Sequence, residues 1–116
     1  MRTDDLIRVG ELEIRTQDGL VLASGRVVTL SVREFQLLVA LARHAGRVVR
    51  RESLYELVWG GELRSGDRSI DVYVRKLRVK LEKALPDRRF IHTHVGFGYR
   101  LEPELSQSFH TTDTQR

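Results

Sequence analysis

The segment RSIDVYVRKLRVKLEK, residues 68–83, has the pattern of an amphipathic helix whose exposed face is unusual. Four apolar residues recur at steps of four, three and four, which places them in one stripe that a helix must bury. These residues are Ile70, Val74, Leu77 and Leu81. The opposite face carries Arg and Lys side chains together with two valines, Val72 and Val79. Valines in the middle of a basic face raise the question of what covers them.

The net positive charge of the chain is concentrated on this same segment. The 116 residues sum to +4, and residues 68–83 alone hold six basic and two acidic side chains, which also give +4. The three flanking segments, 1–31, 32–67 and 84–116, sum to −1, +1 and 0. A surplus confined to one helix indicates a polyanionic partner. A solvated helix rich in Lys and Arg would carry the same charges.

Length and composition exclude several classes of protein. A chain of 116 residues, 41% hydrophobic and 31% charged, is typical of one small globular domain. It has no cysteine, which excludes disulfides, thiolate metal sites and a cysteine nucleophile and favours a reducing, cytoplasmic location. No apolar run is long enough to cross a bilayer, so we expect no membrane association, and the first five residues lead into no signal-peptide core.

The amino-terminal third has the periodicity of strands. Residues 6–15, 19–24 and 26–30 alternate or cluster apolar residues and are separated by turn-forming pairs. They predict three short antiparallel strands, or four if the first stretch is broken at Gly10.

The period then changes to that of helices. Ser31 and Glu34 form a capping-box pattern that starts a helix expected to end at Gly46. The apolar face of this helix is predicted to contain Phe35, Leu38, Leu41, Ala42 and Ala45.

A second helix is predicted within residues 52–61, after the extended link RVVRR. Its buried face is expected to hold Leu54, Leu57 and Val58, and Gly60 with Gly61 should end it. Its N-cap position is occupied by Arg50, which should weaken the cap by about 1 kcal/mol compared with a small polar residue.

The third helix is the basic one, and a hairpin follows it. Asp67 is a good N-cap residue, and we expect the helix to stop near Leu85 because Pro86 disfavours a helical residue before it. Residues 90–101 predict a hairpin that turns at Gly96-Phe97-Gly98.

Five sequence blocks in this order resemble the C-terminal effector domain of OmpR/PhoB-type response regulators. The blocks are Leu30–Leu38, Val58–Gly60, Ile70–Val72, Arg75–Arg78 and Gly96–Tyr99. The resemblance extends from about Leu6 to Leu101. It implies an α+β fold, a winged helix-turn-helix with an N-terminal antiparallel sheet, a three-helix bundle and a C-terminal β-hairpin wing. The expected domain covers residues 6–102, between a flexible N-terminus (1–5) and a disordered tail (103–116).

The function implied by the resemblance is sequence-specific binding of double-stranded promoter DNA by a bacterial transcription regulator of a two-component system. Such domains commonly bind as tandem head-to-tail pairs. Helix 68–83 would enter the major groove, and wing 90–101 would contact the backbone or the minor groove. The thymine methyl group is an apolar target beside hydrogen-bonding atoms, which gives Val72 a reason to be exposed.

The resemblance also assigns DNA contacts to individual positions. We expect Ser69, Val72 and Lys76 to read bases, and Asp71 to contact a base edge or to orient an arginine. The residues expected to contact the phosphate backbone are Trp59, Arg68, Tyr73, Arg75, Arg78 and Thr93. Simpler roles stay open for some of these positions, because Tyr73 could flank the core, Trp59 could be a core residue with one polar edge, and Thr93 could be a strand-forming threonine. For Val79 we favour an ordinary surface valine.

The wing departs from the family pattern. Where the family often has an arginine just before the Gly-x-Gly-Tyr turn, this chain has Val95. A minor-groove arginine contact therefore cannot be assumed, although His94 or Arg100 could take its place.

Other functions fail at identifiable residues. VGFGYRLE lacks the leading basic residue and the later aromatic of an RNA-recognition signature, and GELRSGDR lacks the Lys-Ser/Thr of a phosphate loop. His92 and His94 could be two metal ligands, but no third is apparent. No carboxylate lies in an apolar setting suited to acid–base chemistry. We therefore predict no enzyme activity, no cofactor and no metal.

The main alternative is a winged-helix protein-interaction module that contacts RNA polymerase through loop 60–67 and has little DNA specificity of its own. The sequence contains no receiver domain with a phosphoacceptor aspartate, so we expect either the effector part of a longer protein or a protein regulated by other means.

Overall fold

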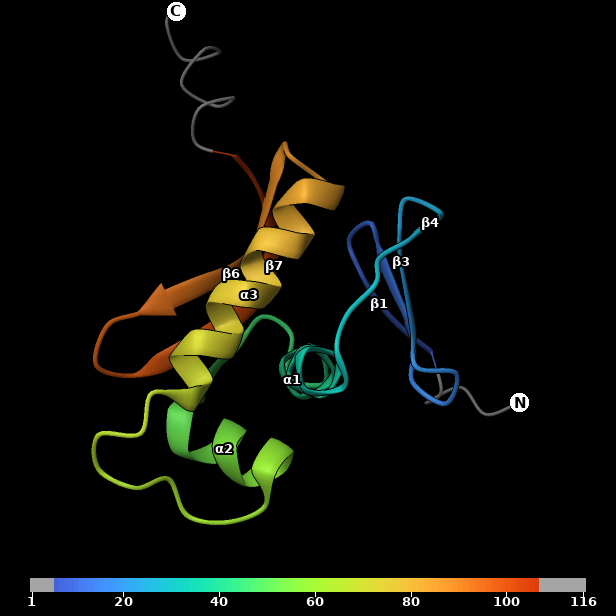
Figure 1. The fold of residues 1–116 in the computed structure, drawn as a ribbon. Coiled ribbons are helices and arrows are strands. Elements are labelled where there is room, and N and C mark those ends of the chain that lie inside the picture. The colour runs from blue at the N-terminus through green and yellow to red at the C-terminus, as the bar shows by residue number, and fades with distance from the viewer. Residues whose placement is uncertain (1–5, 107–116) are drawn as a thin grey trace, which may run out of the picture.

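A computed structural model describes residues 6–106, which form seven strands and three helices (Figure 1). In chain order the elements are β1 (Leu6–Val9), β2 (Leu12–Arg15), β3 (Leu20–Ala23), β4 (Arg26–Val27), α1 (Val32–Ala42), β5 (Val48–Arg50), α2 (Arg51–Trp59), α3 (Ser69–Ala84), β6 (Arg88–His94) and β7 (Gly98–Leu105). The predicted flexible N-terminus, residues 1–5, and residues 107–116 of the predicted tail 103–116 lie outside the described residues.

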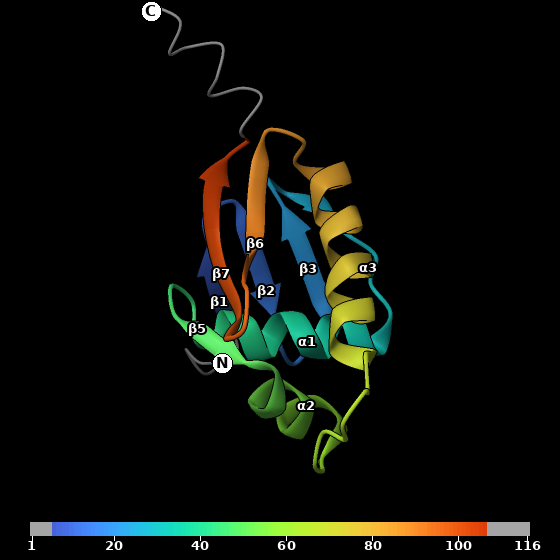
Figure 2. The ribbon, with the colours of Figure 1, turned by 90° about the vertical axis from the view of Figure 1, so that its left-hand side faces the viewer.

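The elements form two antiparallel sheets with the helices packed against them. The amino-terminal sheet has the strand order β1-β2-β3-β4, and the carboxy-terminal sheet has the order β5-β7-β6. In Figure 1, α1 lies between the amino-terminal sheet on one side and α3 with β6 and β7 on the other. The expected α+β winged helix-turn-helix is confirmed. Figure 2 shows α3 and the β6–β7 hairpin side by side on the side opposite that sheet.

The amino-terminal sheet has four strands because the first stretch breaks at Gly10, the second of the two outcomes predicted. Gly10 has a φ of +55°, which a turn between β1 and β2 requires. Alternate residues of β2 and β3 enter the core, as the period of a half-buried strand predicts. These residues are Leu12, Ile14, Val21 and Ala23.

Helix α1 starts as predicted but ends earlier. The Ser31 hydroxyl accepts from the Glu34 N–H, and the Glu34 carboxylate accepts from the Ser31 N–H, so the capping box is present. The helix ends at Ala42 because the chain tightens into successive turns after it. Gly46, predicted as the helix end, instead lies in these turns with a φ of +85° and donates its N–H to Leu101 O.

The buried faces of α1 and α2 differ from prediction at several positions. Leu37 and Ala40 are buried although neither was assigned to the core, and Phe35 is only partly buried. Ala45 is exposed because it lies beyond the end of α1. Leu57, predicted to be buried, is 59% exposed. Only Leu54 and Val58 of α2 are buried, so the side of α2 that carries Leu57 is largely exposed to solvent.

The boundaries of α2 match the prediction. Arg50 occupies the N-cap position and makes no side-chain cap bond, whereas Gly60 ends the helix with a φ of +74°. The extended link before α2 is strand β5, which pairs with β7. The carboxy-terminal sheet therefore has three strands, where the sequence predicted a two-stranded hairpin.

Helix α3 buries the predicted stripe completely and leaves the two valines exposed. Val72 is 46% exposed and Val79 is 54% exposed. The predicted N-cap was wrong by one residue, since Arg68 occupies that position without a side-chain cap bond. Asp67 instead accepts from the N–H and the hydroxyl of Ser69 (2.8 and 2.6 Å), which lowers the pKa of the Asp67 carboxyl.

The hairpin is longer than predicted at both ends. Arg88 pairs with Leu105 and Arg89 with Glu104, with an irregularity between Arg89 and Ile91. The tail boundary predicted at residue 103 was therefore wrong, because β7 continues to Leu105 through these pairs.

An ion pair between a buried carboxylate and a partly exposed lysine joins α1 to α3. Glu34 is only 3% exposed, and its Oε1 lies 2.7 Å from Lys80 Nζ. Burial favours the neutral acid, but the hydrogen bonds from Lys80 and from the Ser31 N–H, with the charge of Lys80, hold the pKa of Glu34 below its ordinary value. The carboxylate therefore caps α1 and holds α3 at the same time.

Acid should weaken the ion pair between Glu34 and Lys80. Because the folded state lowers the pKa of Glu34 from an ordinary value of 4.5, the stabilisation is present above that pH and is lost as pH falls through the lowered value. We expect Glu34→Gln to lower the free energy of unfolding by about 1–3 kcal/mol at neutral pH. Urea unfolding across pH should show the difference between variant and parent shrinking in acid. A difference that does not change with pH would contradict this account.

Gly98 should tolerate no side chain. It has a φ of +153°, and a Cβ at this position would lie 2.1 Å from the carbonyl oxygen of Val49 on β5. We expect Gly98→Ala to lower the free energy of unfolding by at least about 2 kcal/mol, because β5 and β7 must separate. Gly61→Ala is the control, since a Cβ there meets no atom within 4 Å, and it should change stability by less than about 0.5 kcal/mol. Equal effects in thermal unfolding would refute the steric argument.

Candidate nucleic-acid interface

One side of α3 presents a continuous face of cationic and apolar side chains. Its buried stripe packs inward, so the exposed residues lie on the outer side of the helix. The predicted residues that are exposed here are Arg68, Val72, Arg75 and Lys76. Ser69, Asp71, Tyr73 and Arg78 flank them at intermediate exposure. In Figure 1, α3 lies on the opposite side of α1 from the amino-terminal sheet.

Asp71 connects three elements. Its carboxylate accepts from Arg51 at the start of α2 (3.2 and 3.0 Å) and from the Tyr99 hydroxyl on β7, and Arg68 Nε lies 3.6 Å away. Burial opposes ionisation, but the bonds from Tyr99 and Arg51 lower the pKa of Asp71. Burial and the same bond raise the pKa of Tyr99 to about 12.

Aromatic side chains connect the end of α2 to α3. The Trp59 ring stacks on Tyr55 with centroids 5.2 Å apart and meets Tyr73 edge-on at 5.5 Å. The Arg33 guanidinium lies 5.0 Å from the Trp59 ring, and Lys76 Nζ lies 4.8 Å from the Tyr73 ring. Trp59 and Tyr73 are both half-buried, so each packs against the core and keeps an edge at the surface beside a cation.

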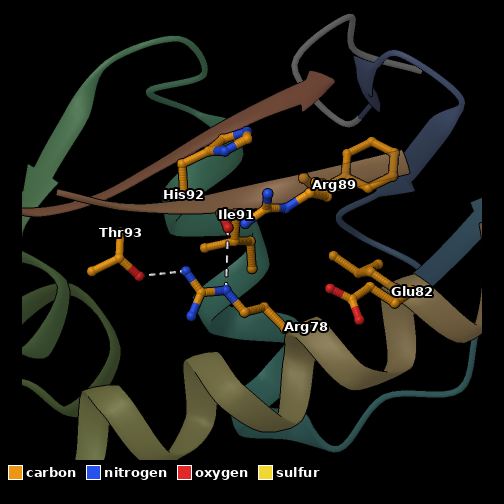
Figure 3. Close-up of a pocket in the computed structure, with 8 residues that line it drawn as sticks. Arg78, Glu82, Arg89, Ile91, His92 and Thr93 are labelled. Atoms are coloured by element: carbon orange, nitrogen blue, oxygen red, sulfur yellow. Dashed lines mark hydrogen bonds between the residues drawn. The ribbon is translucent and has the colours of Figure 1, made fainter. Parts of the chain in front are cut away.

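Arg78 joins α3 to the wing. Figure 3 shows its guanidinium pointing at β6, where Nε donates to Ile91 O (3.1 Å) and Nη2 donates to Thr93 Oγ1. Arg78 and Thr93, predicted separately, are therefore direct partners. They line a groove of about 390 Å³ between α3 and β6, together with Leu81, Glu82, Arg89, Phe90, Ile91 and His92.

A larger concavity of about 690 Å³ lies between the start of α2, the start of α3 and the tip of the wing. Its lining includes Arg50, Arg51 and Arg68 on the helix side. On the wing side, Arg100 pairs with Glu102 and Glu104 and donates to His94 Nε2. The Arg100 guanidinium therefore already has partners on β6 and β7.

Sequence reasoning missed the partners that position these side chains. Arg33, Arg51 and Tyr99 were not assigned to the site, although each contacts a predicted residue. Arg51 follows Arg50 in a basic pair at the start of α2, which was the only available signal. The contacts of Arg33 and Tyr99 join residues 26 and 28 positions apart, and nothing in the local pattern marks them.

The described residues contain few other candidate sites. Within residues 6–106, no three His, Asp or Glu side chains gather closely enough to hold a metal ion. In the same range, no helix has the length and apolar character needed to span a membrane.

Three helices, of which the last is basic and exposed along one side, followed by a hairpin packed beside it, define a winged helix-turn-helix domain. The chain belongs to the family described as "Transcriptional regulatory protein, C terminal", whose model matches residues 25–101. The predicted resemblance to OmpR/PhoB-type effector domains is thereby confirmed.

The most similar known proteins include regulators and their isolated domains. The chain is 37% identical over 99 residues to the alkaline phosphatase synthesis transcriptional regulatory protein SphR of Synechococcus elongatus, covering 85% of this chain and 38% of that protein. The DNA-binding domain of CpxR from E. coli aligns with a TM-score of 0.75 at 34% identity, covering 84% of this chain and 95% of that one. The Klebsiella pneumoniae RstA DNA-binding domain, solved in complex with the RstA box, aligns with a TM-score of 0.73 at 32% identity, covering 84% and 96%. The chain spans half or less of the length of the curated relatives it matches.

The Asp71–Arg51 pair should contribute more to stability than an exposed pair. The side chains of Arg51 and Asp71 are 33% and 28% exposed, and Tyr99 shares the carboxylate. A double-mutant cycle with Arg51→Gln and Asp71→Asn, followed by urea unfolding, should give a coupling energy of about 1–2 kcal/mol. The matched control is Arg50 with Glu52, 3.8 Å apart and 77% and 64% exposed, where we expect about 0–0.5 kcal/mol. Equal coupling in the two cycles would contradict a structural role for Asp71.

Proposed function

We propose that this domain binds double-stranded promoter DNA sequence-specifically, as part of a cytoplasmic bacterial transcription regulator. The observation that carries the proposal is the outer face of α3, which is basic and carries two exposed valines, Val72 and Val79. A face of this kind suits the major groove, where cations meet phosphates or guanine and valine meets the thymine methyl group. The relative RstA, of the same fold, was solved with its DNA box.

The proposed contacts follow from exposure and from the bonds already made. Val72 and Lys76 are exposed and are proposed to read bases, together with Ser69, whose hydroxyl can still accept a hydrogen bond while it donates to Asp67. Arg68 and Arg75, both exposed, are proposed to hold phosphates.

The partly buried residues are proposed to act in two ways. Trp59 and Tyr73 would present their polar edges to the backbone beside Lys76, and Thr93 would do so from the wing. Asp71 and Arg78 use their hydrogen bonds within the protein, so we propose that they position α3 against the wing and orient Arg68.

The proposal extends to partners of the whole protein. As members of the family commonly do, two copies are proposed to occupy adjacent sites on DNA. We propose that the exposed loop 60–67 contacts RNA polymerase. Because the family is one of transcription regulators, we propose no enzyme activity.

Selection of this domain on randomised duplex DNA at near-physiological salt should enrich a motif. We expect Lys76→Ala and Val72→Ala each to relax the preference at one position, by about 1–3 kcal/mol of discrimination for the lysine. Arg75→Ala should weaken binding to all sequences and reduce the slope of log K against log salt by about 0.9. Arg26→Ala and Val27→Ala, exposed on β4 across α1 from α3, are the matched controls and should change nothing.

The same experiment separates the alternative function. A protein-interaction module would enrich no motif and would keep its partner affinity at high salt and in the Arg75 and Lys76 variants. That result would favour contact with RNA polymerase as the main function of the domain. It would contradict the proposal that α3 reads bases directly.

A further inference from the structure

The tip of the wing is apolar and almost fully exposed. Val95 is 87% exposed and Phe97 is 73% exposed, which are among the highest values for large hydrophobic side chains in residues 6–106. They flank Gly96, whose φ of +82° forms the tight turn that the Phe97 N–H closes by donating to His94 O (2.8 Å). A rigid turn therefore presents two apolar side chains where solvent alone would favour polar ones.

These two side chains border the concavity already described between the wing and the starts of α2 and α3. Its opposite wall carries three arginines, Arg50, Arg51 and Arg68, against two carboxylates, Glu52 and Asp71. Both carboxylates are paired with these arginines, at 3.8 Å for Glu52 and 3.0 Å for Asp71. The concavity therefore has a surplus of one positive charge on its helix side, and its wing side combines the apolar Val95 and Phe97 with Thr93 and His94.

The family resemblance already implies that the wing lies at the backbone or the minor groove. We propose that Phe97 and Val95 act as apolar wedges against the sugars and base edges of the minor groove, next to the major groove occupied by α3. This inference rests on the proposed function. In duplex DNA one phosphate backbone separates a major groove from the adjacent minor groove. With α3 in the first and the wing in the second, that backbone passes through the basic concavity between them.

The chemistry of the tip determines which sequences it prefers. A cation in the minor groove favours A-tracts, because their narrow groove has an enhanced negative potential. Residues 95–98 carry no charge, and Arg100 is paired with Glu102 and Glu104. Apolar side chains instead gain where a base step opens easily, and pyrimidine–purine steps such as TA and CA do so at the lowest energy. The wing should therefore select deformable steps and bend the duplex.

The test uses the duplex that the unmodified domain selects, synthesised with either a TA step or an A-tract at the position flanking the α3 contacts. Fluorescence titration measures affinity, and energy transfer between labelled duplex ends measures bending. We expect tighter binding and a larger bend with the TA step. Phe97→Ala should lose about tenfold in affinity on that duplex, the order expected for losing a buried phenylalanine side chain. It should lose much less on the A-tract.

A gain-of-function variant makes the test independent of any loss of structure. Val95→Arg should shift the preference to the A-tract and steepen the salt dependence by about 0.9 in the log–log slope. Val27→Ala, an exposed apolar residue of β4, is the control and should match the parent on both duplexes.

The outcomes separate this inference from the proposed function. If the parent binds its selected site but Phe97→Ala and Val95→Arg leave flank preference and bending unchanged, the wedge is overturned and major-groove recognition stands. If the parent forms no specific complex with any duplex, both are overturned.

Discussion

The carboxylate of Asp71 fixes the geometry on which the rest of the domain depends. It joins the recognition side of α3 to α2 through Arg51 and to the wing through Tyr99. An apolar stripe alone lets a helix slide or rotate by small amounts at low energy, because the hydrophobic effect has no direction. Hydrogen bonds do have direction. The stripe of α3 therefore provides burial, and Asp71 sets the position of the exposed face relative to its neighbours.

Two further side chains on α3 form a hydrogen bond or an ion pair with other elements. Arg78 reaches β6, and Lys80 reaches the buried Glu34 at the start of α1. Together with Asp71 they connect α3 to every other helix and to both long strands of the wing. The residues of α3 that are proposed to contact DNA thus lie on a helix held by side-chain contacts to α1, α2 and the wing, which is the arrangement that precise recognition requires.

Local signals in the sequence predicted the helices well, because each signal and its effect lie within a few residues. The spacing of Ile70, Val74 and Leu77 predicted which face of α3 is buried, and the pair Ser31 and Glu34 predicted the start of α1. Features that depend on distant partners could not be read in this way. The pairing of β5 with β7 and the exposure of Leu57 depend on how separate elements dock.

The same distinction between local signals and distant partners holds for the candidate site. Residue type and helical face predicted that Arg75 and Lys76 would be exposed, which the structure confirms. Their roles on DNA stay predictions. The sequence also offered both roles for Asp71, and only the fold shows that it holds arginines. The partner of Trp59 on α1, Arg33, could not be identified from the sequence because no short-range pattern links the two residues.

The placement of the amino-terminal sheet has a consequence for orientation. The sheet lies across α1 from α3 and the wing, so the two ends of the domain are different surfaces (Figure 1). A single domain of this shape has no two-fold axis, and a site that it reads has a polarity along the duplex. Inverting such a site in a promoter would turn the bound domain around, so that the amino-terminal sheet and the wing would exchange positions along the duplex. The orientation of the site therefore determines which surface of the domain faces a protein bound next to it.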